Sequence, residues 1–136
     1  LLNSKYSNTS DFLSSEFIIA KFLIKKNKKI KSALLSFTIQ SNIGDYITTI
    51  IKSVDEILGD KFENSVEIKF NSDSLAPNNY YLRIALFDPN SYFVYDLQEM
   101  ICPFKINDFG TDMARFEGVN YGYFNLKHET NYDWIY

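Results

Sequence analysis

The 136-residue sequence is short of several residue types, and each shortage excludes a class of structure or function. It contains one cysteine, Cys102, so an internal disulfide is excluded and the fold must depend on its hydrophobic core, as cytoplasmic domains usually do. Five glycines are present, and none lies in a phosphate-binding loop or a dinucleotide-binding fingerprint. Nucleotide hydrolysis by this chain is therefore excluded.

Side chains that carry out catalysis or bind metals are also scarce. His128 is the only histidine, whereas zinc sites need several histidine, cysteine or carboxylate ligands. A Cys–His nucleophile pair would have to join His128 to Cys102, and their separation in the sequence neither supports nor excludes it. No spacing identifies the facing carboxylate pair of a glycosidase; the candidates are Asp55, Glu56, Asp88, Asp96 and Glu99. We therefore predict a domain without enzymatic activity, cofactor or metal.

An excess of positive charge and a long apolar run are both missing. The net charge is −3 and the pI is about 5.1, so the basic surface that nucleic-acid binding requires is not predicted. The longest apolar runs, 17–20 and 22–24, are separated by Lys21 and fall far short of the roughly 20 residues of a membrane-spanning helix. Neither a transmembrane helix nor a signal peptide is predicted. The lysine cluster at 25–31 is interpreted as a solvated turn, with contact to an acidic membrane surface as the alternative.

Aromatic residues, in contrast, are abundant. The chain has 12 Phe and 10 Tyr, and these types favour strands and also provide flat surfaces on which ligands stack. Short runs rich in strand-forming residues, separated by polar turns, predict strands over 17–25, 30–40, 46–51, 65–70, 80–87, 92–97 and 103–107. One or two more strands are expected within 115–136, which gives about seven to nine. The sequence therefore predicts an all-β fold, an immunoglobulin-like antiparallel β-sandwich.

Two segments depart from this strand pattern. Residues 53–61 have apolar side chains at helical spacing between Ser53, a suitable N-cap, and Gly59, a suitable stop, which is consistent with a short helix. Residues 1–15 are rich in Ser, Asn and Thr without a sustained period, which predicts a flexible lead-in or interdomain linker. The sandwich domain is then expected over 16–136. Because the chain starts with leucine rather than methionine, we expect it to belong to a longer protein.

Polar and aromatic side chains on the outward side of the predicted strands form the candidate binding surface. Tyr81 and Arg83 share the outward face of the strand at 80–87, and Gln40 and Lys69 are expected as their neighbours on other strands. Sugars bind where rings stack on their C–H faces and polar side chains hydrogen-bond to their hydroxyls. These four residues are therefore candidate carbohydrate contacts. The alternative is that they are ordinary solvent-facing strand residues.

A series of motifs follows in a fixed order along the chain. The run LAPNNYYL at 75–82 contains a hairpin turn, Tyr95-Asp96 follows, and then come Phe104-Lys105-Ile106 and a closing segment from Gly122 to Trp134. This order resembles the C-terminal carbohydrate-binding domain of Wzt, the ATPase subunit of ABC transporters that export O-antigen polysaccharides. That family has a Leu-x-Pro-Gly-x-Tyr hairpin strand, and here Asn78 replaces the turn glycine. The resemblance covers about residues 16 to 134.

This resemblance implies both a structure and a role. It implies an immunoglobulin-like sandwich, and Tyr80, Phe104 and Trp134 are expected in its core. It implies that the domain binds the exported polysaccharide and gives the transporter its specificity, with an ATPase domain upstream and a membrane subunit beside it, at the cytoplasmic face of the bacterial inner membrane. It also implies a homodimer that exchanges the terminal strand ending at 134–136. A protein–protein interaction sandwich without glycan binding is the alternative.

Overall fold

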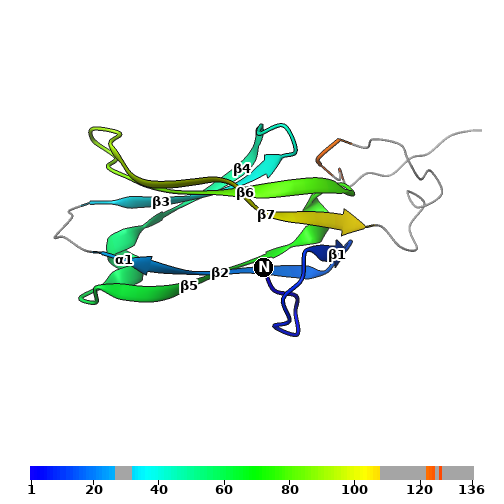
Figure 1. Cartoon of the computed structure of the whole chain (residues 1–136), viewed down its shortest axis with the longest axis horizontal. Helices are drawn as coiled ribbons and strands as arrows, with labels where there is room; N and C mark the ends of the chain where they lie inside the picture. The colour runs from blue at the N-terminus through cyan, green and yellow to red at the C-terminus, as the bar shows by residue number, and fades with distance from the viewer. Residues whose placement is uncertain (27–31, 108–121, 125, 127–136) are drawn as a thin grey trace, which may run out of the picture.

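Strands make up most of this molecule and lie in two stacked layers (Figure 1). The computed structural model describes residues 1–26, 32–107, 122–124 and 126. One layer is a five-stranded sheet, which contains, in spatial order, β1 (Asp11–Leu13), β7 (Val94–Asn107), β6 (Asn78–Phe87), β3 (Leu34–Ser41) and β4 (Tyr46–Ser53). The other layer pairs β2 (Phe17–Lys25) with β5 (Glu63–Asn71). All neighbours are antiparallel except β1 and β7, and the predicted all-β sandwich is confirmed.

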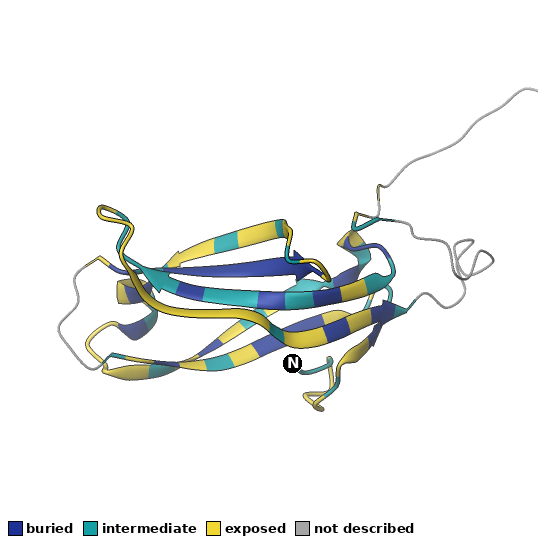
Figure 2. Cartoon of the chain, turned by 45° about the horizontal axis from the view of Figure 1, so that its top comes forward, coloured by how far each residue is buried: buried dark blue, intermediate teal, exposed yellow. Residues whose placement is uncertain are grey.

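The two layers are joined by apolar side chains that alternate along the strands. Figure 2 shows buried residues on strands of both layers. Phe37 of β3 is 1% exposed, and its ring stacks on Phe22 of β2 with centroids 6.5 Å apart and packs against Phe70 of β5 at 6.1 Å. One side chain of the large sheet thus contacts both strands of the small one. Burial of such apolar surface stabilises the fold by about 25 cal/mol per Å².

A second aromatic group in the core surrounds Tyr80. This residue is fully buried, its ring stacks on Phe104 with centroids 5.4 Å apart, and its hydroxyl donates a hydrogen bond to the carbonyl of Ala76. Burial raises the pKa of the Tyr80 hydroxyl far above its ordinary value, so it remains a protonated donor. The core positions predicted for Tyr80 and Phe104 are confirmed, and Trp134 lies outside the described residues.

The short helix expected after β4 is present as α1 (Val54–Leu58). Ser53 is its N-cap, and the Ser53 hydroxyl accepts a hydrogen bond from the Glu56 backbone N–H at 3.4 Å. Gly59 ends the helix with a positive φ of 55°, a conformation that glycine adopts without steric cost. Val54 and Leu58 are buried against the core. A 3₁₀ turn, η1 (Ser72–Ser74), follows β5.

The first fifteen residues differ from the expected flexible lead-in. They contain β1, which pairs in parallel with the end of β7, and Leu2 exchanges two backbone hydrogen bonds with Ile19 of β2. Phe12 is 1% exposed and makes an edge contact with Phe104. The strand was missed because most of this segment is polar and Phe12 is the only buried side chain in β1. The sandwich therefore begins before residue 16.

The strand β7 also differs from expectation, because the sequence predicted two strands at 92–97 and 103–107. The structure has one strand whose register with β6 shifts at several places. Met100 and Cys102 have positive φ values of 51° and 48°, so the backbone is irregular where the sequence pattern breaks off. Such bulges interrupt the alternation of side chains that strand prediction follows.

The predicted strands within 115–136 and the exchanged segment lie outside the described residues, apart from 122–124 and 126. There, Phe124 forms an isolated bridge with Leu75, next to the core. The lysine cluster is also mostly outside the described part of the chain. Among the residues that are described, no helix has the length and apolarity needed to cross a bilayer.

Candidate functional site

The outward side of the five-stranded sheet carries three of the four predicted site residues. Gln40 of β3 is the register partner of Tyr81 in β6, and Thr38 is the partner of Arg83. Partners in an antiparallel pair lie on the same face, so these side chains form two adjacent rows. Tyr81 and Arg83 are both partly exposed. The outward placement assumed for them from the sequence agrees with this register.

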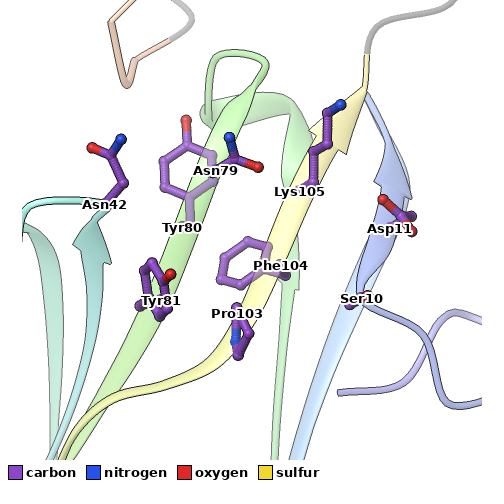
Figure 3. A pocket seen from close by; sticks show the side chains of 9 residues that line it. All are labelled: Ser10, Asp11, Asn42, Asn79, Tyr80, Tyr81, Pro103, Phe104 and Lys105. Carbon is purple, nitrogen blue, oxygen red and sulfur yellow. The ribbon is translucent and has the colours of Figure 1, made fainter.

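Two hollows lie on this face. The first, which we call the polar hollow, has a volume of about 470 Å³ and extends from the β3–β4 turn across β6 and β7 to the start of β1 (Figure 3). Its lining residues are Ser10, Asp11, Asn42, Asn79, Tyr80, Tyr81, Pro103, Phe104 and Lys105. Five of these residues have polar side chains: the hydroxyl of Ser10, the carboxyl of Asp11, the amides of Asn42 and Asn79, and the amine of Lys105. This hollow can hydrogen-bond to a ligand rich in hydroxyl groups.

The second, which we call the aromatic hollow, has a volume of about 300 Å³. Its lining residues are Ser36, Thr38, Tyr46, Thr49, Arg83, Ala85, Phe87, Tyr92 and Val94. Tyr81 lines the polar hollow and Arg83 the aromatic hollow. These two residues are consecutive outward positions of β6, so the two hollows lie next to one another along this strand.

Arg83 has two contacts that fix its guanidinium group. Its Nε donates to Oε1 of Glu99 at 3.0 Å, and its guanidinium carbon lies 5.2 Å from the centre of the Tyr46 ring. The Arg83 side chain is only 16% exposed, whereas that of Glu99 is 50% exposed. The ion pair uses Nε, so the Nη groups carry the remaining donors of the guanidinium. A partly buried arginine held between a carboxylate and a ring presents those donors in a defined direction.

Gln40 has a different place from the one expected. It is 3% exposed, and its Nε2 donates to the carbonyl of Gly44 at 3.2 Å while its Oε1 accepts from the Met100 backbone N–H at 3.1 Å. Both ends of the amide are thus bonded to the main chain. Gln40 lies beneath the candidate face and connects its elements, although its register had suggested a surface contact.

Lys69 does not join the other three residues. It belongs to β5 in the two-stranded sheet, where its Nζ lies 4.4 Å from the centre of the Phe17 ring. Ile68 and Phe70 on either side pack against the core, so alternation places Lys69 on the outer side of the small sheet. The prediction that Lys69 neighbours Tyr81 and Arg83 is therefore wrong. Alternation in the sequence correctly predicted that Lys69 points outward from its strand, but it does not indicate to which sheet that strand belongs.

Several side chains of the face were missed from the sequence. Tyr46 and Tyr92 line the aromatic hollow and Lys105 the polar hollow, whereas Glu99 was considered only as a glycosidase carboxylate. Tyr46 is the register partner of Gln40 in β4, so extending the predicted face by one strand would have found it. Within the described residues, no group of three or more histidine, cysteine or acidic side chains is placed to bind a metal ion.

Comparison with known proteins gives a match in structure alone. No family model matches the sequence, and no curated protein matches it either. A solved structure described as the crystal structure of the C-terminal domain of Wzt superposes with a TM-score of 0.62 and 9% sequence identity. The match covers 96% of this chain and 78% of that one. This chain therefore has the fold of the Wzt C-terminal domain, which is the fold that the sequence motifs implied.

Proposed function

We propose that this chain is a non-catalytic module that binds an exported cell-surface polysaccharide of O-antigen type and gives an ABC transporter its substrate specificity. The observation that carries the proposal is the pair Tyr81 and Arg83, consecutive outward positions of β6 that line two neighbouring hollows on one sheet face. The fold shared with the Wzt C-terminal domain supports the transporter context. Neither argument involves a catalytic group, so we propose binding without chemistry.

The two hollows suit two kinds of contact with a sugar chain. In the aromatic hollow, the rings of Tyr46, Tyr92 and Phe87 offer apolar surfaces for the C–H faces of a pyranose. Arg83 provides Nη donors beside them, already oriented by Glu99. In the polar hollow, amide and charged groups can exchange hydrogen bonds with hydroxyls. A chain of linked sugars could then contact both hollows across β6.

The wider assembly belongs to the same proposal. An ATPase domain would hydrolyse ATP, a membrane subunit would conduct the polysaccharide, and this module would select the substrate at the cytoplasmic face of the inner membrane. The module would act as a homodimer, with the terminal strand exchanged between two copies. Deletion of 134–136 tests the last point, because an exchanged strand is needed to keep the two copies together. Light scattering that still finds a dimer after the deletion would refute strand exchange.

A second function is favoured by one specific feature. Tyr92 and Phe93, at the β6–β7 turn, are 77% and 62% exposed. The Phe93 ring also contacts that of Tyr95, with centroids 5.4 Å apart, and exposed aromatic side chains are common in protein–protein interfaces. A protein partner that binds this turn would make the chain an interaction module without glycan binding.

Calorimetric titration with the polysaccharide of the source strain, and with a mismatched one, tests the proposal. Saturable binding to the first and not the second is expected. Arg83→Ala should weaken that binding by about tenfold or more, since hydrogen bonds to charged groups contribute about 1.5–3 kcal/mol. Lys69→Ala is the matched control, because it removes an exposed cation from the other sheet. Absence of binding to either polysaccharide by a folded sample, with retained binding of a protein through Tyr92 and Phe93, would favour the second function.

A further inference from the structure

A buried amide lies directly under the candidate face. Gln40 is 3% exposed although its register partner Tyr81 faces outward. A buried side-chain amide is costly unless its donor and acceptor are both bonded. Here the donor bonds to Gly44 and the acceptor bonds to Met100. These partners belong to two separate elements, so the amide links them.

Each linked element carries one of the two contacts of Arg83. Gly44 belongs to the turn between β3 and β4, and Tyr46, whose ring lies against the Arg83 guanidinium, is the first residue of β4 after that turn. Met100 belongs to the irregular part of β7, and the residue before it, Glu99, forms the ion pair with Arg83. A displacement of either element would therefore move one of the groups that orient the guanidinium.

The irregular part of β7 has a backbone conformation that needs support. Met100 and Cys102 have positive φ values of 51° and 48°, which are unfavourable for residues with a Cβ. Gly44 has a φ of 91°, and a Cβ added there would lie 3.9 Å from Sδ of Met100. The turn and the irregular segment are thus close neighbours. A hydrogen bond from the Met100 N–H to a fixed, buried acceptor stabilises a conformation that the local sequence does not favour by itself.

We infer that Gln40 is a positioning residue that fixes the Arg83 guanidinium by holding the Tyr46 and Glu99 elements at a set separation. The amide has the correct pattern for this role, one donor toward the turn and one acceptor toward β7. The link to ligand affinity rests on the proposed function. The link to the geometry of Arg83 does not, and it can be measured without any glycan.

The first test follows the Arg83 Nε–H signal by NMR in the absence of ligand. Its cross-peak is assigned by its loss in Arg83→Lys, and its exchange with water reports the ion pair with Glu99. Gln40→Met keeps the length of the side chain and removes both hydrogen bonds, so exchange should become about tenfold faster as the ion pair opens more often. Gln40→Leu also removes both hydrogen bonds and introduces no buried charge, and it provides a second variant if the first does not fold.

A control separates positioning from general loss of stability. Ser72 is fully buried, and its hydroxyl donates to the carbonyl of Leu13 at 2.9 Å, outside both hollows. Ser72→Ala should lower stability to a similar extent but leave the exchange of the Arg83 signal unchanged. Unchanged exchange in folded Gln40→Met, or equal acceleration in Ser72→Ala, would overturn the inference.

The second test connects this geometry to affinity through a double-mutant cycle. Gln40→Met should weaken binding of the source-strain polysaccharide by about five- to tenfold when Arg83 is present, and by less than about twofold in the Arg83→Ala background. Equal losses in both backgrounds would show that Gln40 does not act through Arg83. If no polysaccharide binds to the unmodified protein, the proposed function fails, and the exchange measurement still decides whether Gln40 positions Arg83.

Discussion

The polar side chains on the two outward faces of this sandwich differ in how far they are buried. On the large sheet two polar side chains are buried and hydrogen-bonded: the hydroxyl of Thr38 lies 2.9 Å from that of Thr49, and both ends of the Gln40 amide bond to the main chain. On the small sheet the contacts are exposed, and the Lys25–Glu63 pair has a separation of 3.7 Å with side chains 63% and 60% exposed. Tyr6 and Glu67 likewise form an exposed hydrogen bond at 2.8 Å.

Because of this difference, polar groups on the large sheet have a fixed geometry that suits ligand binding, whereas those on the small sheet are solvated. Exposed pairs are screened by water and salt and are free to rearrange, so each contributes little. Buried, bonded groups keep one geometry, because breaking them leaves polar atoms without partners. A ligand that meets fixed donors loses less conformational entropy on binding. Selective binding is therefore expected on the large sheet and not on the small one.

The largest expected effect comes from removing the core contact on which both faces depend. Phe37 packs against Phe22 and Phe70 of the small sheet, so Phe37→Ala should lower the free energy of unfolding by about 3–5 kcal/mol through lost transfer energy and the cavity left behind. Urea denaturation followed by tyrosine fluorescence measures this. A loss below about 1 kcal/mol would mean that the two sheets do not depend on this contact.

A smaller effect should distinguish the buried and exposed polar pairs. Thr38→Val removes one hydroxyl from a fully buried position and should cost about 1 kcal/mol of unfolding free energy. Lys25→Ala on the small sheet should cost only about 0–0.5 kcal/mol, as an exposed ion pair does. The same denaturation measurement applies to both variants. Equal losses would remove the contrast between the faces.

Binding should show the same contrast between two rings, one on the outer side of each sheet. Tyr81→Ala removes an aromatic side chain that lines the polar hollow and should weaken glycan binding by about three- to tenfold, since stacking contributes about 0.5–1.5 kcal/mol. Phe17→Ala removes a 41% exposed ring from the small sheet and should leave the affinity unchanged. Calorimetry with the source-strain polysaccharide compares the two variants. A greater loss of affinity for Phe17→Ala would show that the glycan binds to the small sheet.

The sequence predicted those features that depend on short-range patterns. Ser53 and Gly59 marked α1 because capping is a local interaction, and alternation gave the outward side of Tyr81 and Arg83 correctly. Longer-range features were missed. Lys69 was assigned to the wrong face because alternation does not say which sheet a strand joins. The burial of Gln40 depends on a backbone N–H sixty residues away in the chain, which no local pattern encodes.

The smallest effect concerns the β6–β7 turn, which supplies Tyr92 to the aromatic hollow. A hydrogen bond from the Asn90 backbone N–H, at 2.8 Å, lowers the pKa of Asp88 below its ordinary 3.8. A lowered carboxyl pKa stabilises the fold above about pH 4 and loses that contribution as the pH falls through the folded-state value. Thermal unfolding at about pH 7 and about pH 3 should therefore show a slightly greater acid loss for the unmodified chain than for Asp88→Asn, which keeps an acceptor without a charge. An NMR titration midpoint for Asp88 at or above 3.8 would show that the turn makes no such contribution.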